Sequence, residues 1–266
     1  MAIMRIFVFT NPLNSCSMKI KNTLLMFLAS GLCLSCSAQL DVRIDGSRTP
    51  VNKTYNDLTD FNALHVSHAF EVDLIPSDRE SVQLMVPPEA ENYLVVKKEG
   101  YTLYIGMRDG YSFRFVNTKD DHCMKAIVYF KELNGVRCSG ASEVDIKGLY
   151  DARNQNLEIS LSGASSFDGN VTNVNKVKAV LSGASELDMK GNGNDMELTC
   201  SGASEAEMDK FQVKNFSGSV SGASKAELYV MENFSGSASG ASKMKVKGNP
   251  RVIKADKSGA SSIIFE

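Results

Sequence analysis

Residues 177–189 read VKAVLSGASELDM, and this stretch decides the fold. Apolar or small residues occupy every second position, with polar residues such as Lys178 and Glu186 between them. Strict alternation is typical of a β-strand with one buried and one exposed face. Because the alternation keeps its phase through Ser-Gly-Ala-Ser, we expect the glycine and the last serine to face inward. The first serine and the alanine are then expected to face outward.

The tetrapeptide Ser-Gly-Ala-Ser is repeated along the chain. Its seven copies begin at Ser139, Ser162, Ser182, Ser201, Ser221, Ser239 and Ser258, at spacings of 23, 20, 19, 20, 18 and 19 residues. Such a unit is too short for a propeller blade and lacks the leucine-rich consensus. A coil of two or three short strands, stacked about 4.8 Å from the next, fits its length. The sequence therefore predicts an all-β parallel β-helix with about 19–20 residues per rung. An antiparallel meander stays open, because alternation does not fix strand direction.

We assign the tetrapeptide a structural role. Small residues suit a tight corner, where glycine can adopt a positive φ. The predicted structural residues are Gly140, Ser142, Gly163, Ser165, Gly183, Ser185, Gly202, Ser204, Gly222, Ser224, Gly240, Ser242, Gly259 and Ser261. A stack of inward serines allows each hydroxyl to donate to one neighbour and accept from another. The alternative is that the outward serine and alanine columns form a flat ligand-binding face.

The N-terminal third keeps the alternation without the tetrapeptide. Residues 67–70, Ser-His-Ala-Phe, stand in its place. We expect wider, irregular rungs that cap the regular part, within one domain spanning 58–266. Residues 39–57 are expected to form a mobile tether. The last tetrapeptide lies close to the C-terminus, so we expect an uncapped final rung that forms a homodimer contact or is covered by a loop.

The first 38 residues have the layout of an export signal, with Met18 the expected start. The apolar run 24–34 has the length of a signal-peptide core and is short for a membrane span. Cys36 is the expected lipidation site of a bacterial lipoprotein, although Cys33 stands where leucine is usual. Cleavage after Ala38, with release of the protein, is the alternative. Both interpretations export the protein, either as an outer-membrane or surface lipoprotein or to the periplasm.

Composition argues against several function classes. Residues 1–36 hold three of the 29 basic residues and none of the 31 acidic ones, which leaves 26 against 31 and a net charge of −5. Without a basic cluster, nucleic-acid binding is not expected. The three histidines, His65, His68 and His122, form no metal-ligand pattern, so neither metal nor cofactor is expected. Cysteines beyond Cys36 are expected to be small buried hydrophobes.

Motifs for catalysis are missing from the sequence. It contains no nucleophile elbow, P-loop or zincin motif, and no tryptophan for a sugar-stacking groove. We therefore expect no enzymatic activity. A polysaccharide-active β-helix enzyme is the alternative that a carboxylate-lined groove would support.

The order of segments resembles a known family. A possible lipid cysteine is followed by Phe61-Asn-Ala-Leu-His-Val, Phe70-Glu-Val-Asp-Leu, iterated Leu-Ser-Gly-Ala-Ser units and a closing Gly248-Asn-Pro. From about Leu58 onward this is similar to the bacterial family called putative auto-transporter adhesin, head GIN domain, common in Bacteroidetes. The resemblance implies a right-handed parallel β-helix in the cell envelope with an adhesin-like role. It brings no catalytic or ligand-binding residues.

These observations lead to one expectation about function. The chain is expected to be an exported, lipid-anchored and non-catalytic envelope protein whose solenoid contacts a protein or glycan ligand. The alternative from another class is a periplasmic scaffold or envelope-stress component.

Overall fold

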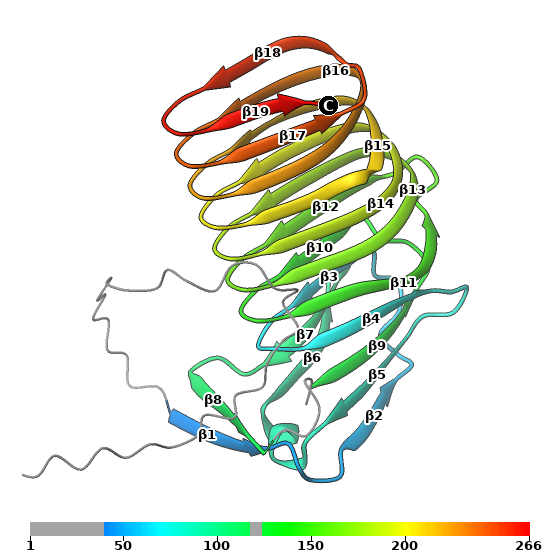
Figure 1. Ribbon diagram of the computed structural model, residues 1–266. Helices are drawn as coiled ribbons and strands as arrows, with labels where there is room; N and C mark the ends of the chain where they lie inside the picture. The colour runs from blue at the N-terminus through cyan, green and yellow to red at the C-terminus, as the bar shows by residue number, and fades with distance from the viewer. Residues whose placement is uncertain (1–39, 118–123) are drawn as a thin grey trace, which may run out of the picture.

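The computed structural model describes residues 40–117 and 124–266, which form an elongated rod of stacked coils (Figure 1). The signal segment 1–38, with Cys36, lies outside the described residues. The N-terminal part contains β1 (Leu40–Asp45), β2 (Val51–Tyr55), β3 (Ala63–Val66), β4 (Glu71–Pro76), β5 (Ser81–Val86), the 3-10 helix η1 (Pro88–Tyr93), β6 (Leu94–Glu99), β7 (Thr102–Met107), β8 (Tyr111–Val116), β9 (Lys125–Phe130) and β10 (Gly135–Cys138). The C-terminal part contains β11 (Glu143–Asp151), β12 (Asn156–Leu161), β13 (Ser166–Leu181), β14 (Glu186–Cys200), β15 (Glu205–Val220), β16 (Lys225–Ala238), β17 (Lys243–Lys247), β18 (Arg251–Lys257) and β19 (Ser262–Phe265).

The strands form two walls that face each other across the core. Wall I contains the strands that lead into the tetrapeptides, with β6, β7 and β3 below them. Their order is β6, β7, β3, β10, β12, the second halves of β13 to β16, and β18. Wall II contains the strands that follow the tetrapeptides, with β2, β5, β9 and β4 below them. Their order is β2, β5, β9, β4, β11, the first halves of β13 to β16, β17 and β19. From β7 and β9 onward the pairing is parallel, so the predicted parallel β-helix is confirmed.

The N-terminal end differs from the predicted wide rungs. There, β6 pairs antiparallel with β7, and β5 pairs antiparallel with both β9 and β2. The turn between β6 and β7 contains Gly100, whose φ is +60°, as a tight hairpin turn requires. The sequence pattern could not show this reversal, because period-2 alternation places side chains on faces and carries no strand direction.

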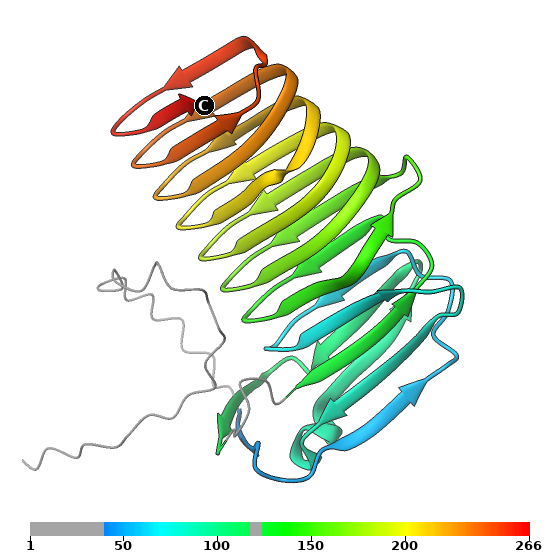
Figure 2. The same cartoon turned by 45° about the vertical axis from the view of Figure 1, so that its right-hand side comes forward.

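The expected tether at residues 39–57 is also corrected. In the described part of this segment, β1 pairs with β8 in a separate two-stranded sheet and β2 joins wall II (Figure 2). Ile44 in β1 is completely buried. Burial of this apolar side chain stabilises the segment on the base of the rod despite its polar composition.

Each tetrapeptide forms the tight corner between wall I and wall II. The last serine faces inward as predicted, and six of these serines are at most 2% exposed. The glycine does not face inward, which corrects the prediction. It lies exposed at the bend with a φ of +70° to +78°, and from Gly163 onward it lies directly above the glycine of the preceding coil. A side chain there would meet the neighbouring backbone, and only glycine tolerates both constraints.

The inward serines bond mainly to their own corner. Ser142, Ser165, Ser204, Ser242 and Ser261 each donate from the hydroxyl to the backbone carbonyl three residues earlier, at 2.8–3.0 Å. A hydroxyl–hydroxyl contact joins Ser204 to Ser224 at 3.3 Å. The predicted ladder between serine side chains is therefore wrong as the main contact, because the corner brings a backbone acceptor closer than the next coil's hydroxyl.

Substitutions at Ser204 and Ser201 test which serine faces the core. Ser204 is 1% exposed, so Ser204→Leu is expected to overpack the corner and lower the free energy of unfolding by about 1–3 kcal/mol. Ser201 lies at the outer surface of the same corner, and Ser201→Lys is expected to change it by less than about 0.5 kcal/mol. Urea unfolding of both variants measures the difference. Equal losses would contradict the orientation of the corner.

Candidate functional site

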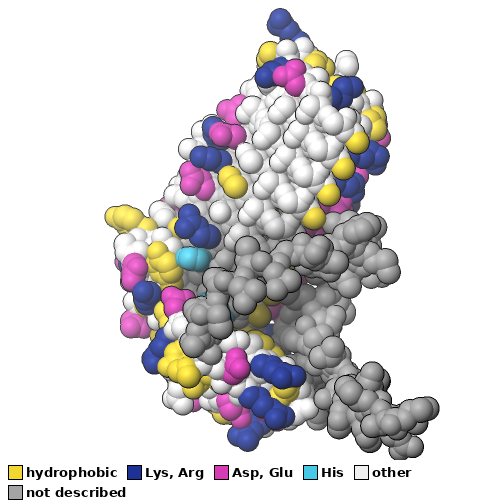
Figure 3. Space-filling view, turned by 90° about the vertical axis from the view of Figure 1, so that its left-hand side faces the viewer, with side chains coloured by type: hydrophobic (Ala, Val, Ile, Leu, Met, Phe, Trp, Pro, Cys, Tyr) yellow, Lys and Arg dark blue, Asp and Glu magenta, His cyan; other side chains and the backbone are white. Residues whose placement is uncertain are grey.

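The broadest candidate surface is the corner side of the rod, which we call the hydroxyl face. It comprises the first serines of the tetrapeptides and the adjacent outward column of wall I, which contains Ser160, Val180, Thr199, Ser219 and Ser237. Figure 3 shows this side as a flat array, largely free of charged side chains, bordered by charged residues on one side and by a row of apolar side chains with charged residues beyond it on the other. The face offers hydroxyls at the strand spacing of about 4.8 Å over the regular coils.

The first serines of this face are held by hydrogen bonds. Ser182, Ser201 and Ser221 donate from their hydroxyls to carbonyl oxygens of the preceding coil at 3.2–3.4 Å. Each hydroxyl hydrogen is used internally, so the oxygen lone pairs remain to accept bonds from outside. Short side chains also lose little rotamer entropy on contact. The face is therefore suited to broad contact with a repetitive or flat surface.

A second candidate surface is the exterior of wall II, where charged side chains stack in register. One column contains Asp73, Asp145, Asp168, Asp188, Glu207, Glu227 and Lys245. The column beside it contains Glu71, Glu143, Ser166, Glu186, Glu205, Lys225 and Lys243. Like charges in adjacent strands repel, and the columns change from acidic to basic toward the C-terminal end.

Lysines offset the repulsion within these columns. Lys147 pairs with Asp145 at 2.7 Å and with Asp73 at 3.0 Å. Burial opposes its charge, but the hydrogen bonds to both carboxylates outweigh burial and raise the pKa of Lys147. Burial also opposes the charge of Lys225, but its hydrogen bonds to Glu205 and Glu227 outweigh burial and raise its pKa to about 12. These lysines therefore stay charged and do not act as bases near neutral pH.

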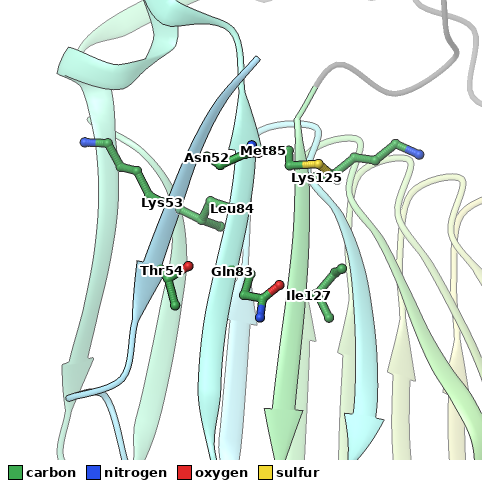
Figure 4. Close-up of a pocket in the computed structure, with 8 residues that line it drawn as sticks. All are labelled: Asn52, Lys53, Thr54, Gln83, Leu84, Met85, Lys125 and Ile127. Atoms are coloured by element: carbon green, nitrogen blue, oxygen red, sulfur yellow. The ribbon is translucent and has the colours of Figure 1, made fainter. Parts of the chain in front are cut away.

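A shallow groove of about 350 Å³ lies at the base of wall II (Figure 4). It is lined by Asn52, Lys53, Thr54, Gln83, Leu84, Met85, Lys125 and Ile127. The ammonium groups of Lys53 and Lys125 extend away from the groove, toward Glu91 at 2.9 Å and Glu71 at 3.1 Å. No carboxylate lines this groove, so it has neither the paired acids nor the convergent charges that sugar cleavage requires.

The histidines of the described residues take structural positions. His68 occupies the place of the corner glycine with a φ of +65°, and its Nδ1 lies 2.8 Å from the Ser67 hydroxyl. His65 lies beside Tyr104 with ring centroids 5.3 Å apart, and burial, with a contribution from Arg137, lowers its pKa. His122 lies outside the described residues.

The cysteines that the structure describes behave as the sequence predicts. Cys138 and Cys200 are buried, and burial raises the pKa of both thiols, to about 12 for Cys200. Neither is a nucleophile near neutral pH. Residues 40–117 and 124–266 contain no cluster of three metal-ligating side chains.

Sequence reasoning missed how three aromatic residues pack in the core. Phe167, Phe216 and Phe234 are each followed two positions later by glycine, and the ring folds over that glycine. A Cβ at Gly236 would overlap the Phe234 ring. The signal was available as the pattern Phe-x-Gly, which recurs in three coils. The Phe-x-Gly pattern marks the coils in which the missing side chain of the glycine leaves room for an aromatic ring.

Fold and surfaces together define a β-solenoid repeat protein whose interior is filled with side chains and whose exterior is repetitive. None of the helices within the described ranges is long and apolar enough to cross a membrane. The chain matches the family described as putative auto-transporter adhesin, head GIN domain, over residues 60–250. It therefore belongs to this family, as the order of its motifs indicates.

Solved structures share the fold. A putative adhesin from Bacteroides fragilis is 18% identical, with a TM-score of 0.73 over 84% of this chain and all of that one. A putative lipid binding protein from Parabacteroides distasonis is 17% identical, with a TM-score of 0.64 over 85% of this chain and all of that one. A putative adhesin from Parabacteroides merdae is 14% identical, with a TM-score of 0.62 over 84% and 99% of the two chains. Comparison with curated proteins finds no match.

Proposed function

We propose that the protein is an exported envelope protein, anchored by a lipid on Cys36, that serves as a non-catalytic, adhesin-like contact rod. The hydroxyl face carries this proposal. It is a long, flat, uncharged array of mostly small side chains, in which the first serines Ser182 and Ser201 already use their hydroxyl hydrogens internally (Figure 3). Such a surface favours contact over an area and lacks the concave, convergent arrangement of an enzyme site. A protein or glycan surface is the proposed ligand.

Membership of an adhesin-like family supports the same proposal. The position of the anchor supports it too. Cys36 precedes the first residue of β1, Leu40, by four positions, and β1 lies at the base of the rod, at the end opposite the C-terminal coil (Figure 1). A lipid on Cys36 would hold the base near the membrane and leave both the hydroxyl face and the C-terminal coil accessible.

Protease and antibody accessibility on intact cells tests the proposal. The wild-type rod is expected to be digested and labelled from outside, whereas Cys36→Ala is expected to move the protein into soluble fractions. Cys33→Ala is the matched control and is expected to behave as wild type. Protection in intact cells, with digestion only after rupture of the outer membrane, would contradict the surface role and favour a periplasmic scaffold.

A further inference from the structure

The last coil of the described residues contains two strands that are each paired on one side. In the described residues β18 pairs with β16, and β19 pairs with β17. Ser262 and Glu266 donate their N–H groups to carbonyls of the β17 side at 3.0 and 2.9 Å. Because N–H directions alternate along a strand, those of Ile263 and Phe265 point away from β17. They form an open edge that another strand can join.

The two edges of this coil are not equivalent. Lys257 in β18 stands opposite the buried Ala238, so a charge occupies an inward position. The register of β18 also shifts by a bulge at Ile253, which is 65% exposed. An inward charge and a bulge are both devices that discourage strand addition. In contrast, β19 pairs with β17 in continuous register and carries the apolar side chains Ile263, Ile264 and Phe265.

The β19 edge lies beside a row of three lysines, two of which pair with carboxylates of lower coils: Lys245 with Glu227 at 3.2 Å and Lys247 with Asp209 at 2.8 Å. Its neighbour β17 carries the outward side chains of Lys243, Lys245 and Lys247, where lower coils of wall II carry carboxylates. A lysine in this wall reaches a carboxylate two strands away, since Lys247 on β17 pairs with Asp209 on β15 at 2.8 Å. An acidic side chain on a strand added to β19 would thus lie within reach of Lys243.

We propose that β19 is an acceptor edge for an extended segment of another protein, with Glu or Asp at outward positions and apolar residues at inward ones. The chain itself pairs acids with lysines between strands of this wall, since Glu205 of β15 bonds to Lys225 of β16 in the adjacent strand. A second copy of the chain fits less well. Two-fold pairing of β19 would bring the lysines of both β17 strands onto one face.

This inference deepens the proposed contact function by naming a partner chemistry. Its test uses purified protein in solution, so its failure would leave the envelope location and the hydroxyl face untouched.

Peptide binding tests the acceptor edge. The probe is a capped, fluorescent peptide of residues 182–191, SGASELDMKG, which carries alternating acidic and apolar residues. Its control carries Glu186→Lys and Asp188→Lys. The acidic peptide is expected to bind at least about tenfold more tightly, with weaker binding at high salt. Hydrogen exchange is expected to slow at the amides of Ile263 and Phe265. Equal binding of the two peptides, or none, would overturn the proposal.

Edge variants locate the contact. Ile263→Pro removes an N–H that faces away from β17 and is expected to weaken binding at least about tenfold. Ala255→Pro removes the equivalent outward N–H of the protected strand β18 and is expected to leave binding unchanged. Thermal unfolding checks that both variants fold. If Ile263→Pro does not fold, Lys243→Glu is expected to weaken binding and the mid-rod control Lys210→Glu is not.

Sedimentation of the free protein distinguishes an acidic partner segment from a second copy of the chain at the β19 edge. A monomer is expected. A dimer that Ile263→Pro dissociates and Ala255→Pro preserves would mean that a second copy occupies the edge, and would overturn the acidic partner. Peptide binding that survives both Ile263→Pro and Lys243→Glu would place the contact elsewhere and overturn the proposal as well.

Discussion

Replacing Phe234 with alanine is expected to lower the free energy of unfolding by about 3–5 kcal/mol. The ring is completely buried and stacks on Phe216, with centroids 5.3 Å apart and planes 10° from parallel. It also meets the edge of Phe265 in the last strand, at 5.2 Å. Because Gly236 has no side chain to fill the space, removal of the ring leaves a cavity. Denaturant unfolding measures the loss.

The effect of Phe234→Ala is expected to be local as well as large. In a solenoid each coil contacts its neighbours only, so loss of one interface loosens the coils beyond it first. Hydrogen exchange is therefore expected to accelerate most in β17, β18 and β19. Met231 lies in the same strand but is 41% exposed, and Met231→Ala is expected to change stability by less than about 0.5 kcal/mol. Similar losses in both variants would contradict the packing.

Gly202→Ala is expected to cost about 2–4 kcal/mol through two separate effects. Its φ of +78° is a conformation that alanine adopts with strain. In addition, a Cβ at this position would lie 2.6 Å from the carbonyl oxygen of Gly183 in the preceding coil. The two coils would have to move apart at the corner, where the N–H of Ala203 bonds to the same oxygen at 2.8 Å.

Gly148→Ala separates strain from contact. Gly148 has a φ of +92°, yet no atom lies within 4 Å of a Cβ built there. Its substitution is expected to cost only the backbone strain, about 1–2 kcal/mol. Thermal unfolding of the two variants compares them directly. A loss at Gly148 as large as that at Gly202 would mean that the close approach of coils contributes nothing.

The regular coils could be predicted from the sequence because their pattern is local. Alternation places Val177, Ala179 and Leu181 in the core, and all three are buried. The corner was predicted from the same pattern, but the position of Gly183 was not. Alternation assumes an extended chain, and at a bend the inward and outward directions cease to alternate.

Other features depend on contacts that the sequence does not display. The antiparallel strands β2 and β5 alternate between more and less buried positions in the same way as parallel ones. The serine hydroxyls were expected to bond to one another, whereas Ser142 and its equivalents reach their own corner carbonyls. The hydroxyl face could not be predicted, because the sequence does not show which outward columns lie beside the corner. Only the register of the paired strands shows this. Lipidation at Cys36 remains a prediction.

The contact of glycine upon glycine has a consequence for how such a chain can change its size. Every regular coil meets the next through the same corner, as Gly202 meets Gly183 and Gly222 meets Gly202. Duplication of one period, such as residues 182–200, would insert a coil and add one new junction, between the coil and its own copy, that keeps the same glycine-on-glycine corner. The rod would lengthen by about 4.8 Å per copy. The length of the rod can therefore change by one coil at a time without a new kind of contact between coils.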